Sequence, residues 1–413
     1  MKPRISLIII PVITLVLALA GGFTLLWRFL IFLAVVLLAS YLWPRLSFRA
    51  IEGKVNITSE GCQVGDGLEE EFTVTNRSRL PTPVIELEED TDLPGHRNVT
   101  AVSLWSRDSY RWQSRVDCRQ RGKYRLGALT ARITDPLGFF PLRRRLGKCR
   151  DVIIYPAAQD LPFFQALPHP SFPLGPSRRL ISETGPNASR VREYNSSDSL
   201  RHVHWHTTAH AGRLMVKEYE PDRSDYAFRD VWIVLDMYHG SRRGEGDETT
   251  EEYGITTAAS LARKYSHAGK RVGLIACGDR PYTFLPEAGD RHLQHMRQAL
   301  ALMRAAGDVP IDALLASEAG RFGAGSVVIV ITTSDNRGIA GPLRRAVNRG
   351  AIVTVILLDS LSFGGDTGAS RTARGLVAGG IPVYVIRRGV PIARALDSRL
   401  TSSRMQYVGD KVP

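Results

Sequence analysis

The N-terminal part of the chain is almost uniformly apolar, which predicts membrane helices. Across residues 5–43 only Arg28 is charged. Ile5–Leu26 and Phe29–Trp43 are each predicted to form a helix, the second being short for a span that needs about 20 residues. A turn near Arg28 separates them. The pattern predicts a two-helix transmembrane hairpin over residues 1–45.

Basic residues lie on both sides of this apolar stretch: Lys2 and Arg4 before it, and Arg45, Arg49 and Lys54 after it. By the positive-inside rule both ends face the cytoplasm. We therefore expect a multi-pass protein of the plasma membrane, in contact with the lipid bilayer, whose soluble part is cytoplasmic. A cleaved signal peptide is the alternative for the first helix, but apolar residues resume directly after Gly21-Gly22 and disfavour it.

Residues 46–160 consist of short alternating runs separated by turn residues. The predicted strands include Glu71–Thr75, Val84–Leu87, Tyr110–Trp112, Tyr124–Leu126 and Val152–Tyr155. Many short strands at a spacing of about ten residues predict an all-β, sandwich-like module. Arg143–Arg145 is interpreted as the solvated face of a hairpin, with lipid headgroups as the other interpretation.

The pattern changes to alternating strands and helices over residues 230–400. Apolar strands are predicted at Val231–Leu235, Arg271–Cys277, Val327–Ile331, Ile352–Leu357 and Pro382–Val385, and helices at Glu251–His267, Arg291–Arg304 and Pro342–Asn348. This succession predicts a doubly wound, mostly parallel α/β sheet, and it resembles a von Willebrand factor A-type domain. Residues 161–229 are interpreted as a linker followed by a distinctive segment, and residues 401–413 as a tail.

Composition adds little to the fold but restricts the function. A hydrophobic fraction of 44% and a charged fraction of 23% are ordinary for globular protein. The net charge of +13 suits a protein beside anionic lipid. No basic run is interleaved with aromatic residues, so we expect no nucleic-acid partner. The four cysteines are far apart in sequence without a C-x-x-C pair, which disfavours a thiolate zinc site and fits a reducing compartment.

The segment Gly185–Glu220 concentrates polar and aromatic side chains between the two predicted modules. Its candidate functional residues are Arg192, Glu193, Tyr194, Asp198, Arg201, Trp205, Thr208, Lys217 and Glu218. Asp198 is predicted to cap a helix that ends at Gly212, and Leu214–Glu218 to form a strand. We call this set of nine residues the signature.

The signature resembles that of a bacterial family catalogued as domain of unknown function 58. Arg192-Glu193-Tyr194, Arg201 with Trp205, and Lys217-Glu218 match its pattern; Ser197 stands where the family usually has Gly. Upstream landmarks also match, at Arg121–Tyr124, Asp135–Phe140 and Val152–Pro156. The resemblance implies a non-enzymatic adaptor that acts with a MoxR-type AAA+ ATPase, often beside a transglutaminase-like membrane protein, in assembly or cell-envelope processes.

A metal site in the α/β domain is the basis of an alternative function. A von Willebrand A-type site needs D-x-S-x-S after the first strand, but Asp236 is followed by Met237-Tyr238-His239-Gly240. Asp236, Thr333, Ser334 and Asp335 remain as a degenerate set that would hold Mg²⁺ weakly. We expect no tightly bound metal and no cofactor; a divalent-metal-dependent hydrolase at these carboxylates is the alternative. His202, His206 and His210 are spaced for a helical zinc site, but Gly212 ends the helix too early for the third.

The signature has two interpretations that one variant separates. In the first interpretation, which we call the latch, its charges form a buried, hydrogen-bonded network that joins the two modules. Arg201→Ala then leaves a buried charge without its partner and lowers the free energy of unfolding by roughly 3–5 kcal/mol. If they form an exposed docking surface, the same change alters stability by at most about half a kcal/mol and weakens partner binding alone. Thermal melting of the variant beside the unmodified chain distinguishes them, and an unchanged transition excludes the latch.

Overall fold

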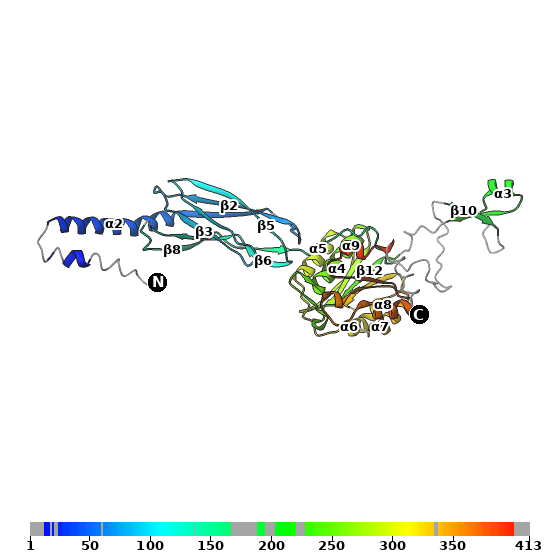
Figure 1. Ribbon diagram of the computed structural model, residues 1–413. Coiled ribbons are helices and arrows are strands. Elements are labelled where there is room, and N and C mark those ends of the chain that lie inside the picture. Colours follow the sequence, from blue (N-terminus) through cyan, green and yellow to red (C-terminus); the bar gives the residue numbers. More distant parts are fainter. Residues whose placement is uncertain are drawn as a thin grey trace. The chain divides into compact units, whose positions relative to one another are not determined.

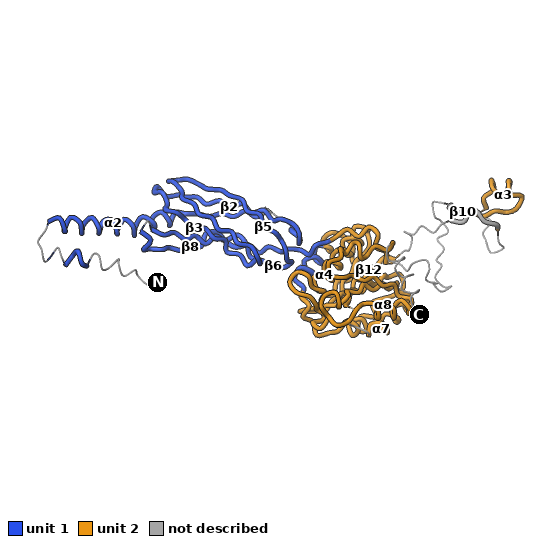
Figure 2. Tube along the Cα trace, viewed as in Figure 1, with its two compact units in different colours: residues 1–158, 294–303 blue, residues 159–293, 304–413 orange. Residues whose placement is uncertain are grey.

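The computed structural model describes residues 12–16, 19, 24–58, 61–135, 137–166, 188–194, 203–219, 228–333 and 338–399, and for residues 188–193 and 217–219 the backbone alone. The predicted tail lies outside this set. The chain divides into two compact units (Figure 2): an N-terminal unit of Met1–Ala158 with Gln294–Met303, and a C-terminal unit of Gln159–Leu293 with Arg304–Pro413.

The N-terminal unit begins with an apolar helix, α2 (Thr24–Arg49; Figure 1). Among the described residues it is the one helix long and apolar enough to cross a membrane. It continues through Arg28, where a turn was predicted, because a straight-chain arginine fits a helix without strain. The predicted hairpin and multi-pass topology are therefore wrong for the described residues, although residues 12–16 are also helical.

The C-terminal end of α2 packs into the β-structure that follows it. Phe48 is buried in the same apolar cluster as strand residues, and Trp43 Nε1 donates to the Pro81 carbonyl at 2.8 Å. Arg144 Nη1 donates to the carbonyls of Phe48 (3.1 Å) and Arg49 (3.0 Å). A cation here satisfies carbonyls that have no partner within the helix and stabilises the negative end of its dipole.

Asp135 forms a second connection between α2 and the β-structure. Its carboxylate accepts hydrogen bonds from Ser40 Oγ of α2 at 2.5 Å, from Phe140 N at 2.5 Å and from Leu137 N at 3.2 Å. Burial raises the pKa of this carboxyl group, but the hydrogen bonds outweigh burial and lower the pKa below its ordinary value. Tyr41 of α2 adds an edge-to-face contact with Phe140, with ring centres 5.3 Å apart.

Nine antiparallel strands follow α2 in the N-terminal unit. One sheet has the order β1 (Ile51–Thr58), β2 (Gly67–Asn76), β5 (Ser109–Asp117); another has β4 (Val99–Val102), β3 (Ile85–Asp90), β7 (Ala128–Ile133), β8 (Leu142–Leu146); and β6 (Gly122–Leu126) pairs with β9 (Arg150–Ile154). The predicted strands are confirmed. Arg143–Arg145 of β8 are exposed, as predicted for a solvated face.

Alternating side chains of these strands build two apolar clusters. Phe72 and Val74 of β2 meet Leu87 of β3 and Leu129 of β7, so two sheets bury their inner faces in one cluster. Leu68, Val116, Leu126 and Ile154 belong to a second cluster. These clusters form because successive side chains of a strand point to opposite faces, so every second residue lies on the same face.

The C-terminal unit contains a six-stranded sheet in the order β16 (Pro281–Glu287), β15 (Arg271–Cys277), β12 (Asp230–Leu235), β17 (Ser326–Thr333), β18 (Ile352–Leu358), β19 (Val383–Ile386). All neighbours are parallel except β15 and β16. The mostly parallel α/β sheet is therefore confirmed. The antiparallel β16 was not predicted, because its buried pattern is interrupted by exposed residues.

Helices cover both faces of this sheet. The helices are α4 (Thr250–His267), α6 (Ile311–Glu318), α7 (Ala340–Asn348), α8 (Ala369–Ala378) and the short α9 (Ile392–Ala395), whereas most of α5 (Asp290–Leu302) belongs to the N-terminal unit. Trp232 and Val234 of β12 share a cluster with Ile311 of α6 and Leu343 of α7. On the opposite face α4 approaches closely at Gly254, where a Cβ would lie 3.2 Å from Leu235 Cδ1.

Residues 161–166, which the sequence suggested were linker, pack onto the C-terminal unit. Phe164 and Ala166 are buried, and the Ala166 carbonyl accepts from Thr354 Oγ1 at 2.5 Å. Tyr384 OH donates to the Gln165 carbonyl at 2.9 Å. Backbone carbonyls thus find partners in the unit, as buried polar groups require.

Asp135→Asn tests the connection to α2. The asparagine keeps an acceptor but loses the charge, so we expect the detergent-solubilised protein to lose about 1–3 kcal/mol of stability at pH 7. Because the folded-state pKa is lowered, this contribution is present above the unfolded pKa and is lost as pH falls through the folded pKa. The difference in Tm between variant and unmodified protein should therefore shrink at acid pH.

The control is Asp151→Asn, since Asp151 forms an exposed ion pair with Lys123 at 2.8 Å. Such pairs contribute little, so its Tm should stay close to that of the unmodified protein. A difference at Asp135 that is equal at pH 7 and at acid pH would contradict the charged-acceptor role.

Candidate functional site

The carboxyl edge of the six-stranded sheet, between β12 and β17, is the candidate site of the C-terminal unit. In chain order β12 is the first strand of this sheet, and its neighbours β15 and β17 extend the sheet in opposite directions. Open α/β sheets bind ligands where the strand order reverses in this way. Asp236 directly follows β12, and Thr332 and Thr333 end β17 beside it.

Asp236 is partly buried and accepts three hydrogen bonds. Its Oδ1 accepts from Tyr238 N at 3.1 Å, and its Oδ2 accepts from Ser241 Oγ at 2.9 Å and from Thr332 Oγ1 at 2.6 Å. The pKa of this carboxyl group is raised above its ordinary value, because the effect of burial is larger than the lowering effect of the three hydrogen bonds. The carboxylate therefore joins the end of β12, the His239–Ser241 turn and the end of β17.

The structure supplies a hydroxyl that the sequence motif lacked. Ser241 lies five residues after Asp236, outside the D-x-S-x-S spacing, and the turn at His239–Ser241 brings its Oγ back to the carboxylate. Thr333 is buried with its Oγ1 unpartnered among the described residues. Ser334 and Asp335 lie outside the described residues, so the predicted degenerate metal set stays a prediction.

The backbone of the signature forms a small hairpin with a helix. β10 (Ala188–Glu193) pairs antiparallel with β11 (Met215–Tyr219), placing Val191 opposite Lys217 and Arg192 opposite Val216. Tyr194 N donates to the Leu214 carbonyl at 2.9 Å. The strand predicted at Leu214–Glu218 is confirmed, shifted by one residue. The fold thus brings the two ends of the signature together.

The helix of this segment, α3 (Trp205–Ala211), starts later than predicted. Its N-cap is His204, whose Nδ1 accepts from Thr207 N at 3.2 Å. Asp198 was the predicted cap and lies outside the described residues. Val203 is not helical: it bridges Val216 of β11, and both are buried. Gly212 ends the helix with a left-handed φ of 62°, as predicted.

The signature residues of known placement have different environments. Thr208 Oγ1 accepts from Met215 N at 3.0 Å and so joins α3 to β11. Trp205 is 68% exposed, and α3 has no buried residue. Arg201 lies outside the described residues, and the side chains of Arg192, Glu193, Lys217 and Glu218 are not described. The charged residues of the signature therefore do not distinguish the latch from the docking surface.

Two of the predicted zinc-site histidines are adjacent. The rings of His206 and His210 have centres 5.0 Å apart on α3. His202, the third predicted ligand, lies outside the described residues. The zinc interpretation therefore has two neighbouring rings in its favour and no third ligand on the described part of α3.

The sequence analysis missed a polar cluster inside the N-terminal unit: Glu70, Glu89 and His96. Both glutamates are buried, and burial together with the Glu89 charge raises the pKa of Glu70. The sequence of β2 contained an indication of this cluster. Glu70 lies on the same face of the strand as Leu68 and Phe72, at a position where the alternation of polar and apolar residues predicts an apolar one.

A pair of cysteines also escaped the sequence analysis. Cys62 Sγ and Cys118 Sγ lie 2.8 Å apart, both buried and recorded as free thiols. Burial raises the pKa of the Cys62 thiol to about 12, and its bond with Cys118 adds to this. Spacing along the chain thus gave no indication of proximity, because β-sheet pairing joins distant segments.

The C-terminal unit is an α/β domain with an acid-and-hydroxyl cluster at the edge of a mostly parallel sheet. Residues 190–362, which contain this cluster and all nine residues of the signature, match the family described as "Protein of unknown function DUF58". This stretch of the chain therefore matches the family that the signature resembles. YeaD of Bacillus subtilis (strain 168), described as uncharacterized, is 25% identical over 312 residues, which are 73% of this chain and 74% of the relative.

Solved structures share only small parts of the chain. The CARDB domain of the PF1109 protein from Pyrococcus furiosus covers 24% of this chain and 85% of its own at 14% identity and a TM-score of 0.18. The C-terminal domain of wzt covers 25% of this chain and 79% of its own at 12% identity and a TM-score of 0.18. Scores this low carry no argument about fold or function.

Titration with Mg²⁺ tests the sheet edge. Both oxygens of Asp236 already accept hydrogen bonds, so a cation must displace protein donors to bind there. We expect calorimetry of the purified chain to show no saturable Mg²⁺ binding at micromolar concentration. A one-site isotherm that disappears in Asp236→Ala but persists in Asp308→Ala, at an exposed carboxylate, would contradict this.

Proposed function

We propose that this protein is a membrane-anchored, non-enzymatic adaptor that binds a MoxR-type AAA+ ATPase through the signature. The observation that carries the proposal is the exposure of α3. A helix without buried residues that presents Trp205 at 68% exposure has the character of a docking element rather than of a core. Exposed tryptophan is enriched among residues that dominate binding energy at interfaces.

The hairpin below α3 supports the same function. The pairing of β10 with β11 and the buried Val203–Val216 bridge hold the segment together. Thr208 fixes α3 to β11 through its bond with Met215 N. A recognition helix held on a preformed support binds with a smaller loss of conformational entropy.

Anchoring is supported by α2. Its apolar composition and its length of 26 residues suit one membrane span, a test that a signal sequence would also meet. Arg45, Arg49 and Lys54 follow the apolar part, which by the positive-inside rule favours a cytoplasmic soluble part. The packing of Phe48 and Trp43 into the β-structure supports retention of the helix as an anchor, because cleavage after the helix would remove both residues from these contacts.

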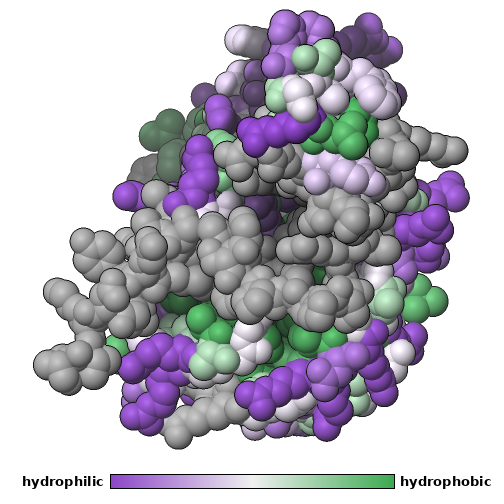
Figure 3. All heavy atoms as spheres, turned by 90° about the vertical axis from the view of Figure 1, so that its right-hand side faces the viewer, coloured by the Kyte–Doolittle hydropathy of each residue, from purple (hydrophilic) through white to green (hydrophobic). Residues whose placement is uncertain are grey.

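The two units supply the scaffold. A sandwich-like β module and a von Willebrand A-like arrangement of the six-stranded sheet are both folds on which binding surfaces are common, although fold alone does not determine function. Figure 3 views one face of the molecule, where hydrophilic side chains border patches of hydrophobic ones. Mixed surfaces of this kind suit protein partners, including the transglutaminase-like membrane protein that the family resemblance implies.

The environment of Asp236 favours an adaptor over the hydrolase alternative. A metal-dependent hydrolase needs carboxylate oxygens that are free to bind a cation or water. Here Ser241, Thr332 and the Tyr238 amide occupy both oxygens of Asp236. The group therefore has a bonding pattern suited to joining strands.

Trp205→Ala tests the docking function. We expect the dissociation constant for the ATPase, measured with the full chain in detergent or nanodiscs, to rise about 30-fold, the effect of losing about 2 kcal/mol at an interface centre. The Tm should remain unchanged, because α3 has no buried residue. The matched control is Trp105→Ala, an equally exposed tryptophan of the N-terminal unit, which should bind normally. Equal affinity for both variants would exclude Trp205 as a docking residue.

A further inference from the structure

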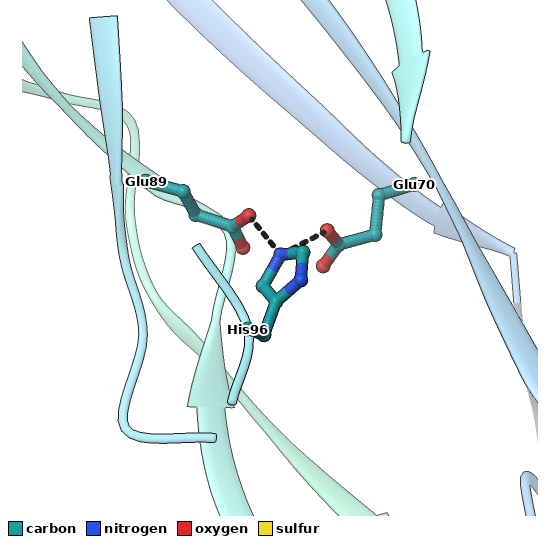
Figure 4. A group of neighbouring side chains, drawn as sticks. All are labelled: Glu70, Glu89 and His96. Atoms are coloured by element: carbon teal, nitrogen blue, oxygen red, sulfur yellow. Dashed lines mark hydrogen bonds and ion pairs between the residues drawn. The ribbon is translucent and has the colours of Figure 1, made fainter. Parts of the chain in front are cut away.

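Three potential metal-binding side chains meet in the interior of the N-terminal unit. Glu70 projects from β2, Glu89 from β3 and His96 from the loop between β3 and β4. His96 Nε2 lies 3.0 Å from Glu89 Oε2 and 3.9 Å from Glu70 Oε2. Figure 4 shows the imidazole between the two carboxylates, which point toward it from different strands. One ligand atom from each residue lies within 4.8 Å of the others.

Glu70 has no adequate partner in this cluster. Its side chain has no exposed surface, and within the described part of the chain no amide, hydroxyl or basic group donates a hydrogen bond to either of its carboxylate oxygens. Glu89 is better satisfied, because its Oε1 accepts from Gly127 N at 3.3 Å and its Oε2 from His96. Among the described residues no lysine or arginine forms an ion pair with either glutamate. A buried carboxylate without a donor is strongly unfavourable, so the site lacks a positive group.

The apolar surroundings of Glu70 increase the energetic cost of its buried charge. Leu68, on one side of Glu70 along β2, belongs to one apolar cluster, and Phe72, on the other side, belongs to the second. The glutamates come from two different sheets, β2 from the three-stranded one and β3 from the four-stranded one. The cluster is thus a polar layer between two apolar ones, and it connects the two sheets.

The spacing of the ligand atoms fits a small divalent cation. Zinc binds histidine nitrogen and carboxylate oxygen at about 2.0–2.2 Å, which places tetrahedral ligands about 3.3–3.6 Å apart. The separations of 3.0 Å and 3.9 Å lie on either side of that range, so small side-chain rotations would complete the site. The His96 side chain is 12% exposed, which leaves one side of the cluster near solvent for a fourth ligand and for entry of the ion.

We propose that Glu70, Glu89 and His96 bind a divalent transition-metal ion, Zn²⁺ in the first instance, which joins the two sheets of the N-terminal unit. Mixed imidazole and carboxylate ligands suit Zn²⁺ better than the oxygen-only sites that Mg²⁺ prefers. The ion supplies the positive charge that the two carboxylates need. The Gly127 N–H orients Glu89 from outside the ligand set, as outer hydrogen bonds do at metal sites.

The test uses the full chain, purified in detergent and freed of metal with a chelator. Titration with Zn²⁺ should show one site per chain with a micromolar or tighter dissociation constant, and saturation should raise the Tm by several degrees. Glu70→Gln should weaken Zn²⁺ binding by at least about tenfold and abolish the Zn²⁺-dependent rise in Tm. Glu69→Gln, one residue earlier on the exposed face of β2, is the matched control and should titrate like the unmodified chain.

A second variant, His96→Gln, keeps the test valid if Glu70→Gln fails to fold. His96→Gln changes a residue in a loop near solvent, and it should also weaken Zn²⁺ binding while the metal-free Tm stays near that of the unmodified chain. Two results overturn the proposal. One is a Zn²⁺ isotherm that survives in both variants, which places the ion elsewhere. The other is the absence of Zn²⁺ binding by the unmodified chain together with a raised metal-free Tm in Glu70→Gln, which assigns the cluster to two carboxyl groups sharing a proton.

Discussion

A buried carboxylate persists only where donors or a cation surround it, and this constraint acts at the main junctions of the structure. Asp135 satisfies it with Ser40 of α2 and the amides of its own loop. Asp236 satisfies it with Ser241, Thr332 and a backbone amide. In each case one donor, Ser40 or Thr332, comes from an element distant in sequence, so satisfying the charge also joins two elements. Glu70 is the exception among the described residues, and it is there that we propose a bound cation.

The junction at α2 matters for how an anchored protein works. Trp43, Phe48 and Arg144 tie the last turns of the helix to the β-structure through a hydrogen bond, a buried ring and two carbonyl contacts. The helix therefore continues from the apolar segment into the module without a flexible connection within Thr24–Thr58. In the proposed adaptor, an anchor attached in this way would hold the N-terminal unit in one orientation to the lipid surface.

The signature and the sheet edge divide the C-terminal unit into two chemically different regions. At the sheet edge, Asp236 is partly buried and accepts hydrogen bonds on both oxygens, an arrangement that stabilises strand ends. In the signature, α3 offers an exposed indole on a hairpin support. The first region suits structure and the second suits recognition, which is why the proposed binding function is placed at the signature, although sheet edges bind ligands in other α/β proteins.

The sequence by itself determined the local elements, because they depend on periodicity and on residues at their ends. The parallel strands at Val231–Leu235 and Ile352–Leu357 and the end of α3 at Gly212 all follow from such patterns. The spacing of the signature also indicated the family whose description matches residues 190–362. The sequence misplaced the break at Arg28 and the cap at Asp198, since an arginine is compatible with a helix and Val203 gains more by pairing with Val216 than by continuing a helix.

Only the tertiary structure decided which distant side chains meet. Ser241 reaches Asp236 through a turn, Cys62 approaches Cys118 through strand pairing, and Glu70 faces Glu89 and His96 across two sheets. None of these contacts follows from spacing along the chain, because sheet order and register set them. The alternation of β2 did place Glu70 inside, but a single inward glutamate has no chemical meaning until its neighbours are known. The physical reason is that the alternation along a single strand predicts which of its side chains are buried, whereas a metal site needs side chains from several segments that only the folded chain brings together.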